Sequence, residues 1–565
     1  MRKVATTIFV LILSGLGTLT ATAAPKPADQ ARTMSDVIDR VITNENRASQ
    51  QIRQYSPLVE TYIQNLKPDK ELGYVPAGDK YFLGRADFSK GVTLVSLTDT
   101  SGKGKKIFGS IGNFFSFALQ FVPDGFLQMI FIDTNGFDKQ HYKFDYVRRE
   151  FLGEVRCLVF DVTPQEKSGK GRFLGRIWVE DQDYNIVRFN GAYSGSGHTS
   201  WWFHFDSWRT NVQPGLWLPS FVYSEEKDVH YNLSKKLDFK AQTRLWGYNL
   251  GHASQEQELS KILVETPVQD DTKTANDLTP VQAQRSWDRQ AEDNVIDRLE
   301  RIGLIGPKGE VDKVLETVVN NLEVTNNIDI EPDVRCRVMT TTTLESFTVG
   351  HTVVLSRGLI DVLPDEASLA TIIAHELSHA ILGHRLDSSL AFFDQLLIED
   401  KETFRHFGFA RTPDEEKAAN AKAIQILNNS PYKNQLGNAN LFLTALATRA
   451  KEIPNLISPH LGDRVPVIGD LRSSMAVDAD AKKNPQMITA LPIGGRVKLD
   501  PWNDKLELIK SKPIGAVAER EKMPFEVTPF MPYLVRYGAE AAKPIAASAA
   551  QPPDPKTGES APGKP

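Results

Sequence analysis

The sequence predicts a multidomain α+β protein, with an antiparallel β-rich domain followed by a mainly α-helical domain that contains a small sheet. Two observations support this prediction. A chain of 565 residues is too long for one compact core. Its texture also changes along its length: short β-branched and aromatic runs between turn residues fill residues 81–250, and longer runs with helical spacing follow from Trp287.

The first 24 residues have the order of a secretory signal peptide. Met1-Arg2-Lys3 is basic, a largely apolar run extends to about Leu19, and small residues including Ala21 and Ala23 end it. We expect residues 1–24 to be cleaved and the mature protein to be exported. Retention as a membrane anchor is the alternative, because the apolar run approaches a membrane-spanning length.

We expect residues 25–264 to form the β-rich domain. The apolar spacing of residues 34–66 predicts one opening amphipathic helix, closed by Pro68. The best predicted strands follow it, at residues 114–121, 125–132, 151–162, 171–179, 186–189, 200–205 and 216–223. The aromatic residues Trp201, Trp202, Phe203 and Phe205 are read as sheet core, and a ligand groove is the alternative.

The composition of the remaining chain sets the other boundaries. Residues 265–285 are rich in Thr, Asp, Lys, Gln and Pro, which predicts a linker. A second folded domain is expected at 286–480, with helices at 287–302 and 311–322 and strands at 334–340 and 352–355. A carboxy-terminal extension follows at 481–540, and residues 541–565 have the composition of a disordered tail.

Charge and cysteine content exclude some functions. The net charge of -5 offers no basic field for a polyanion, so we expect no nucleic-acid partner. The two cysteines, Cys157 and Cys336, lie in separate strand-like runs and are expected to be buried free thiols rather than a disulfide or a metal site.

One segment carries the pattern of a metal site. In His375-Glu376-Leu377-Ser378-His379 the two histidines are four residues apart, which places them on one face of a helix. Asp365 can cap this helix at its start. Two imidazoles at this spacing can bind one zinc ion, and the intervening Glu376 can act as the general base of a metallopeptidase.

The residues alone leave the third ligand open. Glu416 is the best candidate, in a predicted second helix, although its acidic surroundings are also typical of a solvated helix start. His384 lies five residues after His379, so we expect it on another face of the helix in a structural role.

Residues 288–464 resemble the zinc endopeptidase family of HtpX and the CAAX prenyl endopeptidases, metallopeptidase family forty-eight. The matching motifs, in order, are Val353-Val354-Leu355-Ser356-Arg357-Gly358-Leu359-Ile360, Asp365-Glu366, His375-Glu376-Leu377-Ser378-His379 and Glu416-Lys417-Ala418-Ala419-Asn420. The resemblance implies that residues 286–480 are a zinc metallopeptidase domain. It also implies that His375, His379 and Glu416 are the zinc ligands and that Glu376 is the general base.

Two further positions follow from this resemblance. Asn420 stands where the family has an aspartate that braces a ligand histidine, and this change is expected to lower metal affinity or rate. His460, in Ser458-Pro459-His460-Leu461-Gly462-Asp463-Arg464, is the counterpart of a family histidine that assists catalysis; an ordinary surface loop is the alternative. The family's substrates commonly pair with an edge strand, which places docking at residues 347–355.

Parts of the β-rich domain resemble the LolA/RseB-like fold of bacterial envelope proteins. The resemblance is carried by residues 150–153, 160–164, 175–179 and 186–188. It implies a curved sheet that shelters acyl chains or lipoprotein, and a periplasmic location.

Together these patterns predict an exported zinc-dependent metalloendopeptidase with one Zn²⁺ per chain, which hydrolyses peptide bonds through a metal-activated water. We expect protein or peptide substrates, with misfolded envelope proteins as one candidate class, and at most peripheral contact with a membrane. The alternative function is a non-catalytic periplasmic carrier or scaffold for lipid or protein, in which the zinc site is vestigial.

Overall fold

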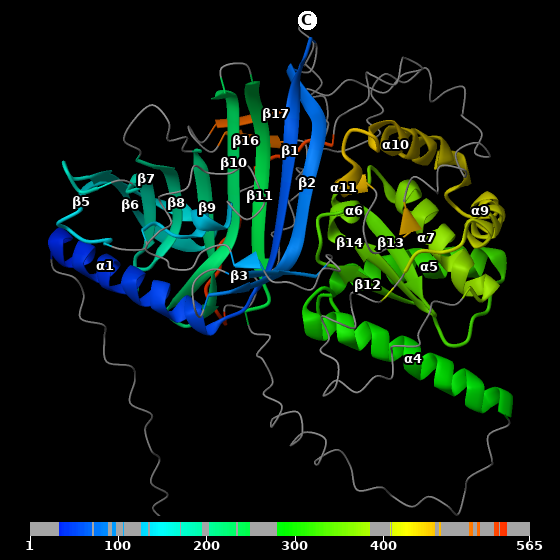
Figure 1. Cartoon of the computed structure of the whole chain (residues 1–565). Coiled ribbons are helices and arrows are strands. Elements are labelled where there is room, and N and C mark those ends of the chain that lie inside the picture. The colour runs from blue at the N-terminus through cyan, green and yellow to red at the C-terminus, as the bar shows by residue number, and fades with distance from the viewer. Residues whose placement is uncertain are drawn as a thin grey trace, which may run out of the picture.

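The structure is a computed structural model. It describes residues 33–70, 73–88, 93–97, 105–106, 126–133, 136–169, 171–194, 203–232, 235–248, 280–384, 407, 409–457, 463–464, 497–500, 505–508, 525–529 and 532–538. The expected signal peptide, most of the linker and the expected tail lie outside these residues. A large sheet and a mainly helical unit lie side by side (Figure 1).

An antiparallel sheet dominates the amino-terminal part. Its described strands lie in the order β4-β3-β2-β1-β11-β10-β9-β8-β7-β6-β5. Their bounds are β1 Leu58–Asp69, β2 Gly73–Asp87, β3 Thr93–Ser96, β4 Lys105–Lys106, β5 Tyr142–Leu152, β6 Val155–Pro164, β7 Phe173–Glu180, β8 Ile186–Tyr193, β9 Phe205–Gln213, β10 Leu216–Asn232 and β11 Lys235–Trp246. The predicted antiparallel β-rich domain is therefore confirmed.

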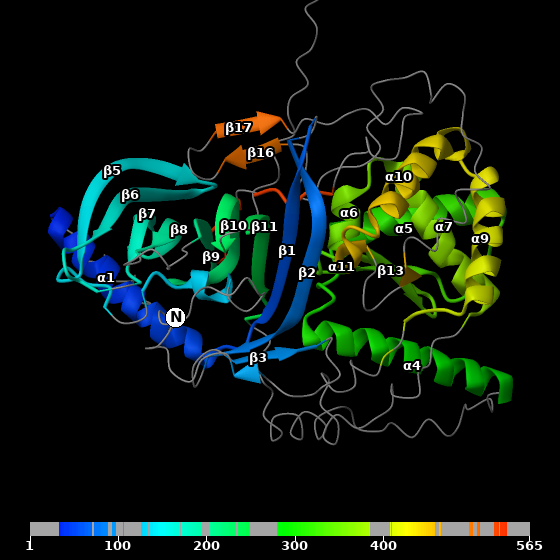
Figure 2. The ribbon, with the colours of Figure 1, turned by 45° about the horizontal axis from the view of Figure 1, so that its top comes forward.

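A helix covers one face of this sheet. In α1 (Met34–Gln51), Thr33 and Asp36 form a capping box at the start, and Val37 and Val41 are buried. The η3 turn (Leu127–Ile130) joins α1 in the same apolar core, and α1 runs across the strands on this side (Figure 2). A buried ion pair of 2.6 Å between Arg209 and Glu45 fixes the helix to β9.

Several local predictions for this region are wrong. The single strand predicted at residues 151–162 is interrupted by a turn, because β5 ends at Leu152 and β6 begins at Val155. The opening helix ends at Gln51, and after the short η1 turn (Ile52–Gln54) the chain forms β1 instead of continuing as a helix to residue 66. Almost every residue of β1 from Leu58 to Leu66 is buried, so the strand lacks the alternating polarity that would have revealed it. Residues 127–130 form a 3₁₀ turn rather than a strand.

The second domain is mainly helical around a small sheet, as predicted. Its helices are α4 Pro280–Ile302, α5 Glu310–Asn326, α6 Arg357–Val362, α7 Glu366–Leu382, α9 Pro413–Asn428, α10 Leu436–Arg449 and α11 Pro454–Ile457, with an η4 turn at Lys433–Gln435. The sheet order is β12-β14-β13-β15, with bounds β12 Arg335–Met339, β13 Glu345–Val349, β14 Thr352–Ser356 and β15 Asp463–Arg464. The α4 helix begins at Pro280 rather than 287, because proline is well suited to the first helical turn.

The two domains share a continuous interface. Aromatic residues of the large sheet and apolar residues of α5, α7 and α10 belong to one buried cluster. Polar contacts supplement it: Asp79 on β2 accepts hydrogen bonds from the backbone of Asn455 and Leu456 on α11, at 3.2 and 2.9 Å. The second domain is therefore held by its neighbour through specific hydrogen bonds as well as by apolar packing.

Part of the carboxy-terminal extension lies against the large sheet. The backbone N–H of Val527 donates to Gln64 Oε1 at 2.7 Å, and Gln64 Nε2 donates to the carbonyl of Phe525 at 2.5 Å. Phe525 also contacts the ring of Phe442 on α10. This segment therefore contacts both domains. Earlier in the extension, β16 (Val497–Asp500) and β17 (Lys505–Leu508) form a two-stranded antiparallel sheet.

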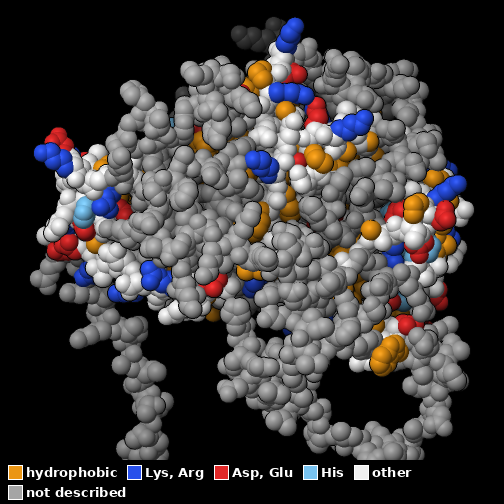
Figure 3. Space-filling view, in the orientation of Figure 1, with side chains coloured by type: hydrophobic (Ala, Val, Ile, Leu, Met, Phe, Trp, Pro, Cys, Tyr) orange, Lys and Arg blue, Asp and Glu red, His pale blue; other side chains and the backbone are white. Residues whose placement is uncertain are grey.

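Other expectations concern thiols, membranes and surface charge. Cys157 and Cys336 are buried free thiols, as predicted. Among the described residues, no helix combines the length and apolarity that a membrane span requires. On the face seen in Figure 3, described acidic and basic side chains are interspersed rather than separated by sign.

Substitution of Gly153 should loosen the carboxy-terminal segment. Gly153 has a φ of 65°, and a Cβ there would lie 2.5 Å from the backbone N and O of Leu534. We expect Gly153→Ala to lower the thermal midpoint more than Gly73→Ala, whose Cβ meets nothing within 4 Å. The control carries only the left-handed backbone cost of about 1–2 kcal/mol. Equal midpoints for the two variants would contradict this packing.

Candidate metal centre

The α7 helix carries the two histidines of the predicted site. As expected, Asp365 caps it: its carboxylate accepts a hydrogen bond of 2.8 Å from the backbone N–H of Ser368. The helix is buried along most of its length, including His375 and His379. At its end Gly383 adopts a φ of 68°, a left-handed conformation that glycine reaches without strain.

The α9 helix brings a carboxylate to the same place. Thr412 and Glu415 form a capping box and Pro413 occupies the first turn, so the helix start is well defined. Glu416 follows at once and is buried, and Asn420 is buried one turn later. The helix packs directly against α7.

The predicted ligand atoms converge. The Nε2 atoms of His375 and His379 lie 3.2 Å apart, and the Glu416 carboxylate oxygens lie 3.3 Å and 3.9 Å from them. One ligand atom from each residue fits within 4.8 Å of the others. Ligands of one tetrahedral zinc at about 2.0–2.1 Å lie about 3.3 Å from one another. The donor set and its spacing therefore fit zinc.

The environment favours the neutral imidazole that a metal requires. Burial, with a contribution from the neighbouring His375, lowers the pKa of His379 to about 2. His379 therefore has no tendency to hold a second proton at neutral pH. Its Nε2 lone pair is then available to a cation.

The spacing predicted His384 on another face of the helix, and this prediction is wrong. Its Nδ1 lies 2.9 Å from Nδ1 of His379. The chain reverses at Gly383, so His384 folds back beside the last turn of α7 instead of continuing around it. A partner on the far nitrogen of a ligand histidine fixes its ring orientation and tautomer. Gly383, immediately before His384, was the sequence signal that could have predicted the end of the helix at this point.

Two hydroxyl groups of β13 hold the carboxylate of Glu376. Ser346 Oγ donates to its Oε1 at 2.6 Å, and Thr348 Oγ1 donates to its Oε2 at 2.7 Å. Burial raises the pKa of Glu376, and these two hydrogen bonds oppose the rise. The sequence analysis missed Ser346 and Thr348, because a hydroxyl within a strand carries no distinctive motif.

Two other predicted residues have different outcomes. In the described part of the chain, Nδ1 of His375 has no hydrogen-bond partner, so Asn420 does not brace this ring. His460 lies outside the described residues, and its role stays a prediction. The chain is described again at Asp463–Arg464, which pairs antiparallel with Ser346 and Glu345 of β13.

The expected docking region at residues 347–355 is not a single edge. It spans two strands of a hairpin, and β14 lies inside the small sheet between β12 and β13. Along β13, Glu345 and Ser346 pair with β15, and the carbonyl of Thr348 accepts a 2.7 Å hydrogen bond from Arg411. In the described sheet β13 also lies between two strands, β14 and β15, so neither strand of the hairpin is the free edge that the docking prediction requires.

Removal of the His384 ring should weaken metal binding. We expect His384→Ala to reduce zinc affinity by about 10–100-fold, the usual effect of losing a hydrogen-bond partner of a ligand histidine. Competition with a chromophoric chelator measures the affinity. His351→Ala is the control, because His351 lies in the β13–β14 turn beside Glu292. Equal affinities in both variants would show that His384 does not support the site.

The sequence was compared with models of known protein families and with curated proteins. Residues 308–439 match the family model described as peptidase family M48. A search of curated proteins finds no match.

Two solved structures show only weak similarity to this chain. An outer membrane lipoprotein-sorting protein domain from Vibrio parahaemolyticus is 10% identical with a TM-score of 0.20, over 37% of this chain and 92% of that one. A DUF1329 family protein from Desulfovibrio piger is 11% identical with a TM-score of 0.21, over 39% and 98%. TM-scores this low support no conclusion about fold. The resemblance to peptidase family M48 is confirmed over residues 308–439, the segment that contains His375, His379 and Glu416.

Proposed function

We propose that this chain is an exported zinc-dependent metalloendopeptidase. The observation that carries the proposal is the convergence of His375, His379 and Glu416, with ligand atoms within 4.8 Å of one another, beside the buried carboxylate of Glu376. The match to peptidase family M48 supports a metallopeptidase acting on proteins or peptides.

His375, His379 and Glu416 would hold a zinc ion, and three protein ligands would leave a fourth position for water or substrate, as in catalytic zinc sites. Zinc in such a site supplies Lewis-acid polarisation of the scissile carbonyl and acidifies a water molecule. His375 and His379 would contribute imidazole nitrogens from one helix, and Glu416 would contribute a carboxylate from a second. The packing of α7 against α9 brings these three side chains together.

Glu376 is suited to move the proton during hydrolysis. It would accept a proton from the attacking water and pass it to the leaving amine, so that one water is consumed for each peptide bond cleaved. Each carboxylate oxygen has two lone pairs, and Ser346 and Thr348 use one on each. The carboxylate is thereby held in place and keeps capacity for the proton.

Export rests on the amino-terminal sequence. The basic start, apolar run and small residues of residues 1–24 support a cleaved signal peptide and export. Together with the resemblance of residues 150–188 to bacterial envelope proteins, they favour a periplasmic location. The β-rich domain would then be a module that presents substrate or localises the enzyme.

Metal analysis tests the ligand set. We expect about one zinc per mature chain by mass spectrometry, and loss or weakening of zinc in Glu416→Gln. Glu415→Gln is a matched control, because Glu415 accepts hydrogen bonds from Thr412 at the helix start. Absence of zinc from the wild type, even after its addition, would instead favour the non-catalytic carrier of lipid or protein.

Loss of the general base should separate binding from chemistry. We expect Glu376→Gln to retain zinc and to lower cleavage of an unfolded protein such as casein by at least about 10²-fold, the usual contribution of a general base. Initial rates with zinc-loaded protein measure the effect. Cleavage at the wild-type rate would overturn the role of Glu376.

A further inference from the structure

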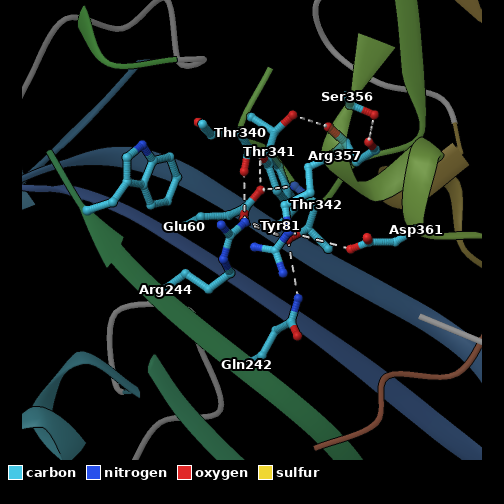
Figure 4. A network of polar contacts seen from close by, with 12 residues as sticks. Glu60, Tyr81, Gln242, Arg244, Thr340, Thr341, Thr342, Ser356, Arg357 and Asp361 are labelled. Atoms are coloured by element: carbon cyan, nitrogen blue, oxygen red, sulfur yellow. Dashed lines mark hydrogen bonds and ion pairs between the residues drawn. The ribbon is translucent and has the colours of Figure 1, made fainter. Parts of the chain in front are cut away.

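A buried carboxylate of the large sheet binds the second domain in the segment that leads into β13. Glu60 on β1 is 1% exposed. From its own sheet it accepts hydrogen bonds from the Tyr81 hydroxyl at 3.0 Å and from Arg244 at 3.1 Å. From the second domain it accepts the Thr342 backbone N–H at 2.6 Å and the Thr342 hydroxyl at 2.7 Å (Figure 4). Glu60 therefore joins the two domains through one residue, Thr342.

The segment that contains Thr342 is fixed on both sides. Arg244 also donates to the carbonyl of Thr340 at 2.8 Å. Beyond Thr342, the Thr343 hydroxyl donates to the Glu345 carboxylate, and the Thr343 carbonyl accepts a 2.5 Å hydrogen bond from Ser356. Residues 340–345 thus connect Glu60 to the first residue of β13.

The β13 strand then contacts the proposed general base. Ser346 and Thr348 are two residues apart in an extended strand, so their side chains lie on the same face. Both hydroxyls donate to the carboxylate of Glu376. Only three residues of chain lie between Thr342, which Glu60 binds, and Ser346, which binds Glu376.

We propose that the β-rich domain positions the general base of the second domain, with Glu60, Ser346 and Thr348 as positioning residues. The Glu60 carboxylate fixes residues 340–345, these fix β13, and the two hydroxyls of β13 fix Glu376. This inference rests on the proposed function. It gives the large sheet a role in catalysis besides localisation or substrate presentation.

The energetic consequence concerns orientation rather than metal binding. Among the described residues, Glu60 and Thr342 form hydrogen bonds with each other and with Tyr81, Arg244 and Gln242. The metal ligands His375, His379 and Glu416 come instead from α7 and α9. A misplacement of about 1 Å in a catalytic group can lower a rate by about 10²-fold. Loss of the Glu60 contact should therefore reduce kcat and leave zinc content and KM nearly unchanged.

The test compares Glu60→Gln with Glu225→Gln. Glutamine keeps the shape of Glu60 but places an amide N–H₂ against Arg244 or the Thr342 donors. Glu225 on β10 is the matched control, because its half-buried carboxylate accepts a 2.6 Å hydrogen bond from Tyr223 and lies 3.9 Å from Lys240, both within the same sheet. Zinc content, kcat and KM on casein, and hydrogen exchange of residues 340–349 are measured for both full-length variants.

We expect Glu60→Gln to keep zinc and KM, to lower kcat by about 10–100-fold, and to accelerate exchange in residues 340–349. Glu225→Gln should match the wild type in all four measurements. Thr348→Val should lower kcat, and Thr348→Ser, which retains the hydroxyl, should restore it.

Three results would overturn the inference: unchanged exchange in residues 340–349 of Glu60→Gln, an unchanged kcat, or loss of zinc together with activity. A wild-type protein that binds zinc but cleaves nothing would refute the proposed function and, with it, the role in catalysis. The exchange measurement would still decide whether Glu60 fixes β13, so the two failures can be told apart.

Discussion

The burial of four ionisable side chains at one point between α7 and α9 constrains the rest of the described structure. His375, Glu376 and His379 are fully buried, and Glu416 is 6% exposed. Burying such groups is costly unless each is hydrogen-bonded or balanced by opposite charge. Hydroxyls of β13 compensate Glu376, and His384 compensates the outer nitrogen of His379. The three remaining ligand atoms face one another, and a divalent cation between them would supply the missing charge.

This constraint explains the neighbouring architecture. The two helices must stay in contact, so α9 is sharply started by the Thr412 capping box and α7 by Asp365. The β13 strand must lie beside α7, and its approach is fixed by the hydrogen bonds of Glu60 to Thr342. The large sheet is thus joined to the metal centre through hydrogen bonds as well as apolar contacts.

Sequence patterns predicted what depends on local spacing. Periodicity and motif order predicted three features: the helical pair His375 and His379, the Asp365 cap, and a second helix with Glu416. The structure has all three. Sequence patterns gave wrong predictions where tertiary contacts determine the local conformation. The β1 strand is buried on both faces, and its polar residue Glu60 is hydrogen-bonded by the second domain. Its sequence therefore does not alternate between apolar and polar residues. His384 was misplaced because the chain turn at Gly383 overrides helical geometry. The hydroxyls of Ser346 and Thr348 reach Glu376 only because α7 packs on β13, and this packing cannot be predicted from the sequence.

The most direct test of the metal centre is anomalous diffraction at the zinc absorption edge, from crystals of the full-length mature protein grown with zinc. The account predicts a peak between Nε2 of His375, Nε2 of His379 and the Glu416 carboxylate, about 2.0–2.2 Å from each. A fully occupied zinc peak elsewhere, or the absence of one between these three residues, would contradict it.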